Sequence, residues 1–139
     1  MAAIYTVSAV STGGGRDGDV RSSEGFIDND VKMPPALGGP GGATNPEELF
    51  AAAYATCFHG ALRLVVGKQQ MAVPEGTSVE VAVGIGPDDT SFAINADITA
   101  YLPGLPQETA DQLIAAAHQV CPYSKATRGN IEVTLTATV

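Results

Sequence analysis

The sequence predicts an α+β fold in which antiparallel strands surround one long helix. Runs rich in β-branched residues lie before the helix, at residues 4–11 and 20–27, and after it, at residues 79–85 and 91–102. The chain has 139 residues, of which 45% are hydrophobic and 16% charged, and this is enough apolar material for a packed interior. We therefore expect a single domain that spans residues 1–139.

The first two strand runs are joined by a glycine-rich segment, residues 13–18, which predicts a hairpin with a wide loop. A third short strand is expected over residues 30–33, because Pro34 and Pro35 end it. Residues 37–42 have Gly or Pro at nearly every position and are therefore expected to form a loop.

The strongest helix signal begins at Asn45, a residue suited to cap a helix whose first position is Pro46. Glu48 stands three residues after the cap, as in a capping box. We expect the helix to run to Val66 and to be capped by Gly67. Its apolar face is expected to hold five residues at helical spacing: Phe50, Tyr54, Cys57, Ala61 and Leu64.

The last part of the chain predicts a second helix and a final strand. The helix is expected over residues 107–120, and Pro122 keeps Cys121 out of helical geometry. Alternating apolar residues over 131–137 predict a strand with one buried face. The apolar stripe of the second helix is expected to comprise Leu113, Ile114, Ala117 and Val120.

Composition limits the partners that this chain can have. The formal net charge is -8 with only seven Lys and Arg residues, which disfavours nucleic acids and anionic membranes because phosphate contacts need clustered basic side chains. No apolar run approaches the roughly 20 residues of a membrane span. Residues 1–10 lack the pattern of a secretion signal. We therefore expect a cytoplasmic protein that binds neither nucleic acid nor a membrane.

Neither a metal nor a cofactor is expected. His59 and His118 stand alone and the cysteines are far apart in the sequence, whereas a zinc site needs about four clustered ligands. The glycines of residues 38–42 lack the GxxxxGK[ST] pattern of a phosphate-binding loop.

Cys57 and Cys121 are the two cysteines of the chain. A structural disulfide is not expected in a reducing compartment, and each cysteine taken alone is typical of a small buried hydrophobe. Reactive cysteines are the alternative: a thiolate can attack the O–O bond of a peroxide if a cation stabilises it and a second thiol resolves the sulfenic acid. Arg16 and Glu47, taken alone, suit a solvated turn residue and a partner of the helix dipole.

Three segments together resemble the organic hydroperoxide resistance proteins, which belong to the family shared with osmotically inducible peroxidases. They are TGGGRDG at residues 12–18, GGPGGATNPEELFAAAYATCF at residues 38–58 and VCPYSKATRGN at residues 120–130. The likeness covers nearly the whole chain, including its length and element order. It implies an OsmC-like fold, with antiparallel sheets around a long central helix, and an intertwined homodimer with a site at each interface.

By this resemblance, Cys57 would be the peroxidatic cysteine and Cys121 the resolving cysteine, and the two would form an intramolecular disulfide during turnover. Arg16 and Glu47 match the arginine and glutamate that organise the family's site. The resemblance implies a thiol-dependent peroxidase that reduces alkyl and fatty-acid hydroperoxides to alcohols. It also implies recycling by a dithiol of the lipoyl type, such as dihydrolipoamide.

Elementary electrostatics agrees with these roles, because a guanidinium beside a sulfur favours the thiolate and a carboxylate can hold the guanidinium by a bidentate pair. Ten residues of helix place Glu47 about 15 Å from Cys57 along the axis. We therefore expect Arg16 and Glu47 to reach a given Cys57 from the other subunit, unless the helix bends.

The residues around Cys57 also suggest a substrate preference. A site lined by Phe50, Tyr54, Phe58 and the loop at Leu37 would favour alkyl or fatty-acid hydroperoxides over hydrogen peroxide.

Two alternatives remain open. One is a dimeric module that binds apolar ligands between its helices while both cysteines stay inert. The other is a cysteine hydrolase, which needs a Cys/His pair. His59 is a poor partner because side chains two apart on a helix do not face each other, whereas His118 stands three residues before Cys121 and can approach it.

Overall fold

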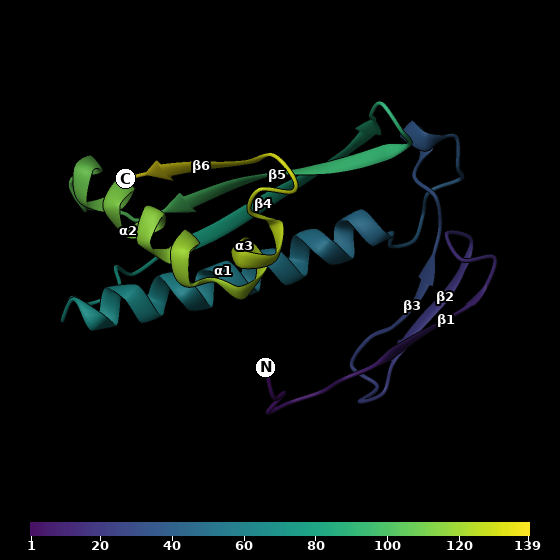
Figure 1. Ribbon diagram of the computed structural model, residues 1–139, viewed down its shortest axis with the longest axis horizontal. Helices are drawn as coiled ribbons and strands as arrows, with labels where there is room; N and C mark the ends of the chain where they lie inside the picture. Colours follow the sequence, from purple (N-terminus) through teal and green to yellow (C-terminus); the bar gives the residue numbers. More distant parts are fainter. The chain divides into compact units, whose positions relative to one another are not determined.

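A computed structural model describes residues 1–139 and contains two three-stranded sheets and one long helix (Figure 1). The chain divides into two compact units, residues 1–49 and residues 50–139. Each unit contains one of the sheets. The single domain over residues 1–139 stays a prediction.

The first unit is an antiparallel sheet of β1 (Ala9–Gly13), β2 (Gly18–Ser22) and β3 (Asp28–Val31) in that order. Gly18, at the end of the first turn, lies so close to the opposite strand that no side chain fits there. A Cβ atom on Gly18 would lie 2.1 Å from the carbonyl oxygen of Thr12. The expected hairpin is therefore confirmed.

Several boundaries in this unit differ from those expected. The second strand ends at Ser22 rather than at Ile27, and the third lies two residues earlier than expected. The first strand begins at Ala9 rather than at Ile4, because Ala9 pairs with Ser22 at the end of β2 and earlier residues have no partner strand in the unit. The segment expected to be a loop is preceded by a short 3-10 helix, η1 (Pro35–Leu37).

The sheet of the first unit buries little apolar surface. Val31, which is 4% exposed, is the one buried hydrophobic residue among residues 1–49. Val10 and Phe26 are exposed at 62% and 90%. The apolar side chains of this unit are therefore left largely uncovered within one chain.

Helix α1 (Pro46–Lys68) begins where the sequence predicts. The Asn45 side chain accepts a hydrogen bond from the Glu48 backbone N–H at 2.9 Å, which is the expected cap. The Glu48 carboxylate accepts a hydrogen bond from the Thr44 hydroxyl at 2.6 Å, so only one half of the expected capping box is present.

The end of α1 was placed too early by the glycine signal. The helix runs through Gly67 to Lys68, and the left-handed residue is Gln70, with a φ of 57°. The N–H of Gln70 donates to Gly67, and that of Met71 donates to Val66, so the last carbonyls of the helix are satisfied beyond the glycine.

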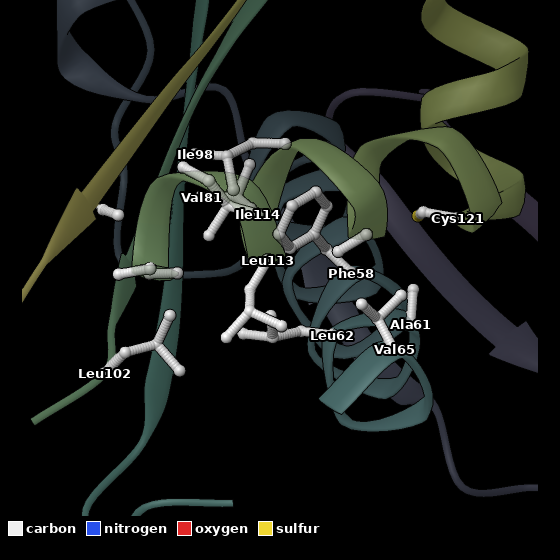
Figure 2. Packing of buried hydrophobic residues seen from close by; sticks show 14 of the residues in the cluster. Phe58, Ala61, Leu62, Val65, Val81, Ile98, Leu102, Leu113, Ile114 and Cys121 are labelled. Carbon is white, nitrogen blue, oxygen red and sulfur yellow. The ribbon is translucent and has the colours of Figure 1, made fainter. Parts of the chain in front are cut away.

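The buried face of α1 is offset from the predicted one. Phe58 and Leu62 enter the core beside Leu113 and Ile114 of the second helix (Figure 2). Leu64 is 53% exposed, which contradicts its predicted burial. The core covers only one side of α1. Leu64, which is two heptads after Phe50, lies at the edge of that side. The residues that are buried on α1 are Tyr54, Phe58, Ala61, Leu62, Val65 and Val66.

By length and composition alone, α1 is apolar enough to cross a membrane, contrary to the expectation from shorter apolar runs. Its most apolar window has a mean hydropathy of 1.5 and is 33% buried within the chain. Tyr54, Phe58 and Val66 are nonetheless completely buried, so α1 serves as the core helix of the second unit.

The second sheet consists of β4 (Ser78–Pro87), β5 (Phe92–Tyr101) and β6 (Val133–Thr138). The first two strands are antiparallel, as expected, whereas β6 runs parallel to β5, a pairing that the sequence did not indicate. A parallel pair needs a crossover of a dozen or more residues. Helices α2 (Gln107–Val120) and α3 (Pro122–Thr127) provide that crossover.

Helix α2 has the predicted bounds, whereas α3 was not predicted. Cys121 forms the junction between them in extended geometry, with φ -67° and ψ 123°, and Pro122 begins the new helix. Val120 is exposed, contrary to prediction, and Cys121 takes its place in the core four residues after Ala117.

The cap of α1 provides a test of the fold. We expect Asn45→Ala to reduce the free energy of unfolding by about 1 kcal/mol, because the Glu48 N–H loses its acceptor. Asn29→Ala, at an exposed position of β3, is the matched control and is expected to change stability by less than about 0.5 kcal/mol. Denaturant unfolding of both variants measures the difference, and equal effects would contradict the assigned cap.

Candidate functional site

The fold brings the two cysteines together, although they lie 64 positions apart. Cys57 comes from the middle of α1 and Cys121 from the junction of α2 and α3. Their sulfur atoms are 3.7 Å apart and both thiols are free. This distance exceeds the about 2.05 Å of a disulfide, so the site is a reduced dithiol pair. Figure 2 shows Cys121 as one of the labelled residues of the buried cluster.

Hydroxyl groups and aromatic rings connect α1 to α3 near the sulfur pair. The hydroxyl of Tyr54 lies 2.9 Å from the hydroxyl of Ser124 and 3.1 Å from that of Thr127. The Tyr54 ring packs against Phe50 edge to face at 5.9 Å and against Tyr123 at 5.8 Å. These contacts hold the start of α3 against α1.

The surroundings of Cys57 within its unit oppose ionisation. Burial raises the pKa of the Cys57 thiol, and the Cys121 sulfur acts in the same direction. The backbone N–H of Tyr123 donates a hydrogen bond to the Cys57 sulfur, which lowers its pKa, but the net direction is upward. A thiolate at neutral pH therefore needs a positive charge that these groups do not supply.

Arg16 and Glu47 form a bidentate ion pair in the first unit. The Arg16 guanidinium donates two hydrogen bonds to the Glu47 carboxylate, at 2.7 Å and 3.0 Å. These bonds hold the pKa of Glu47 below its usual range and raise the pKa of Arg16 further. The arginine lies in the loop between β1 and β2, and the glutamate in the first turn of α1. The two residues expected to act together are thus paired.

The two histidines make no hydrogen bond to either cysteine. His59 Nε2 and His118 Nδ1 are buried without a partner. Burial lowers the pKa of His118, with a smaller effect from Arg128 in the same direction. A cysteine hydrolase needs a Cys/His pair, so this arrangement disfavours that alternative.

The predicted aromatic lining is wrong in two of its members. Tyr54 and Phe58 are completely buried in the core and present no surface to a substrate. Phe50 remains partly exposed, and its ring centroid lies 6.3 Å from that of Tyr123. Sequence reasoning missed Tyr123, although an aromatic residue directly after Cys121-Pro122 was a signal that could have identified it.

A depression of about 450 Å³ lies elsewhere in the second unit, near the hairpin of β4 and β5. Its lining includes Ile85, Ile94 and Glu132 and contains neither cysteine. This depression is therefore separate from the dithiol pair.

Comparison with known proteins identifies the family of this chain. The family model described as OsmC-like protein matches residues 39–136. An organic hydroperoxide resistance protein of Xanthomonas axonopodis pv. citri is 46% identical over 134 residues, which cover 96% of this chain and 94% of the relative.

Solved structures give the same result. The crystal structure of an organic hydroperoxide resistance protein from Legionella pneumophila matches with a TM-score of 0.93 and 43% identity, covering 99% of this chain and all of that one. OhrB of Bacillus subtilis matches with a TM-score of 0.88 and 40% identity, over 98% of this chain and 100% of that one. The chain therefore belongs to the OsmC-like family. Within that family it is one of the organic hydroperoxide resistance proteins, as its three motifs indicate.

The Arg16–Glu47 pair predicts a pH dependence of stability. The pKa of Glu47 is lower in the folded chain than in the unfolded chain, where it is about 4.3. The ion pair therefore stabilises the folded state fully at pH values above the unfolded pKa, and this stabilisation is lost as the pH falls through the folded pKa. We expect Glu47→Gln to cost less than about 1 kcal/mol at neutral pH, since the Arg16 side chain is 39% exposed. The difference from wild type should disappear in acid.

Denaturant unfolding across this pH range checks the prediction. Glu75→Gln, which removes an exposed carboxylate in a turn, is the control and should show no such convergence. A difference for Glu47→Gln that stays constant into acid would contradict the ion pair.

Proposed function

We propose that this chain is a thiol-dependent peroxidase that reduces organic hydroperoxides to alcohols. The observation that carries the proposal is the reduced Cys57–Cys121 pair, with sulfurs 3.7 Å apart, in a member of the organic hydroperoxide resistance proteins. The Cys57 thiolate attacks the terminal oxygen of ROOH, the O–O bond breaks, and the alkoxide takes a proton to leave as ROH. Cys57 is then a sulfenic acid.

Cys121 resolves this sulfenic acid in the proposed second step. Its thiolate attacks the Cys57 sulfur, the S–O bond breaks, and the hydroxyl group leaves as water with the proton released by Cys121. The product is an intramolecular disulfide. A dithiol, which we propose to be of the lipoyl type because of the family likeness, reduces it by thiol–disulfide exchange.

Arg16 provides the positive charge for the first step in this proposal, and Glu47 holds Arg16 in place. The need for such a charge follows from the raised pKa of Cys57, and the bidentate pair gives the guanidinium a defined orientation. Glu47 and Cys57 are separated by about 15 Å of continuous helix. We therefore propose that the pair acts on Cys57 of a second copy of the chain.

We propose a cytoplasmic homodimer, and the surface of the chain is consistent with the dimer. The first sheet has a single buried hydrophobic residue, and α1 leaves Leu64 uncovered in the single chain. Apolar surface of this kind marks an interface. A second copy that covers it would complete a site at each interface.

The proposed substrates are alkyl and fatty-acid hydroperoxides. Phe50 and Tyr123 form a partly exposed aromatic surface next to the sulfur, since the backbone of Tyr123 donates to Cys57. An apolar surface favours a hydroperoxide with a hydrocarbon chain over hydrogen peroxide.

One observation favours a second candidate, an apolar-ligand-binding module with inert cysteines. The raised pKa of Cys57 is the property of an unreactive buried thiol. The candidates differ in thiol reactivity: stoichiometric hydroperoxide consumes a peroxidatic thiol rapidly, whereas an inert thiol persists.

The proposed peroxidase is tested by removing each sulfur in turn. We expect Cys57→Ser to abolish hydroperoxide reduction, because no nucleophile remains. Cys121→Ser should still react once with a hydroperoxide but should not form the disulfide or turn over efficiently with a dithiol. Mass spectrometry after one equivalent of an alkyl hydroperoxide measures both outcomes. Full activity of Cys57→Ser would exclude the mechanism.

Shared sites are tested by mixing two inactive variants. Cys57→Ser lacks the nucleophile and Arg16→Ala lacks the activating charge. If the charge comes from the second copy, mixed dimers contain one intact site, so refolding the variants together should restore a substantial part of the activity.

The matched control mixes Cys57→Ser with Cys121→Ser, which should yield no fully recycling site because both sulfurs act within one chain. Sedimentation is expected to give twice the 14.2 kDa mass of the chain. A monomeric mass, or no recovery in the first mixture, would contradict the shared site.

A further inference from the structure

Two contacts join α1 to the segment formed by Cys121 and α3. One is the approach of the Cys57 and Cys121 sulfurs to 3.7 Å. The other is the hydrogen bond between the hydroxyls of Tyr54 and Ser124 at 2.9 Å. Tyr54 precedes Cys57 by three residues and Ser124 follows Cys121 by three, so the contacts are successive along two antiparallel surfaces.

The hydroxyl contact is buried and has a third member. Tyr54 and Ser124 are completely buried, and Thr127 is 6% exposed. The Tyr54 hydroxyl also lies 3.1 Å from that of Thr127, which donates to the Ser124 carbonyl at 3.2 Å. Because water cannot replace a lost partner in such a position, breaking one bond leaves a buried polar group unsatisfied. We call these three residues the hydroxyl cluster.

The sulfur contact and the hydroxyl contact are linked through the residue that carries the second sulfur. To form a disulfide, the sulfurs must move from 3.7 Å to about 2.05 Å. Cys121 is an extended junction between two helices and is not itself part of either. The hydroxyl cluster anchors α3 directly after this junction, so the Cys121 side chain can close the gap without displacement of α3.

We infer that Tyr54, Ser124 and Thr127 are positioning residues for the resolving step. This inference rests on the proposed peroxidase function. It assigns the resolving step to the hydroxyl cluster, whereas the Arg16–Glu47 pair acts in the first step. The hydroxyl cluster keeps the Cys121 sulfur within reach of the Cys57 sulfenic acid. Capture as a disulfide then outruns attack by a second hydroperoxide, which would oxidise the sulfenic acid to sulfinic acid.

Tyr54→Phe tests the inference because it removes one hydroxyl and keeps the ring that packs on Phe50 and Tyr123. In rapid-mixing experiments with an alkyl hydroperoxide, the oxidation of Cys57 should stay within about twofold of wild type. The following formation of the disulfide should slow by about tenfold, the effect of a lost buried hydrogen bond. Excess hydroperoxide should convert more of the variant to sulfinic acid, as measured by mass spectrometry.

Ser124→Ala should act in the same direction but less strongly, because Tyr54 keeps Thr127 as a partner. It also keeps the test decisive if Tyr54→Phe fails to fold. The matched control is Tyr101→Phe, at an exposed position at the end of β5, and it should change neither step. A general loss of stability would alter both steps, so equal slowing of both, or wild-type rates in both, would overturn the inference.

An equilibrium measurement separates this inference from the proposed function. The Cys57–Cys121 disulfide can be titrated against glutathione without any peroxide. The effective concentration of one thiol toward the other should fall by about tenfold in Tyr54→Phe. If wild type does not consume hydroperoxide, the proposed function fails while this measurement still reports on positioning. An unchanged equilibrium in Tyr54→Phe would reject the hydroxyl cluster as the positioning device.

Discussion

The ionisation of Cys57 is the constraint on which the rest of the site depends. Burial on an apolar helix raises the pKa of this thiol, and the neighbouring Cys121 sulfur adds to the effect. The same burial places the sulfur beside the aromatic surface of Phe50 and Tyr123, to which we assign the hydrocarbon part of the proposed substrate. In the proposed peroxidase, apolar surroundings favour substrate binding but oppose thiolate formation, and a localised positive charge allows both.

Local sequence signals predicted much of the fold because they act over a few residues. The cap at Asn45 and the bounds of α2 depend on neighbours within one helical turn, and both were predicted correctly. The wrong predictions concern packing. The burial of Leu64 depended on which side of α1 the core covers, and a helical spacing alone allows adjacent sides.

The candidate site could be assembled from the sequence only through its resemblance to a family. Residue spacing does not indicate that Cys57 and Cys121 meet, or that Arg16 pairs with Glu47, because both contacts connect distant parts of the chain. The hydroxyl of Tyr54 was missed for a related reason. A tyrosine at helical spacing among apolar residues is predicted to be part of the core, which gives no indication of a role for its hydroxyl. The polar partners of Tyr54 lie on α3, which the sequence did not predict.

The parallel pairing of β6 explains how the second sulfur reaches the first. An antiparallel return from β5 would need only a short turn, whereas a parallel return requires a crossover. Here α2 and α3 form that crossover, and their junction is Cys121. Pro122 prevents α2 from continuing, so the junction stays extended and fully buried against α1. The deviation from an antiparallel sheet is thus the feature of the topology that places a cysteine from the end of α2 opposite one in the middle of α1.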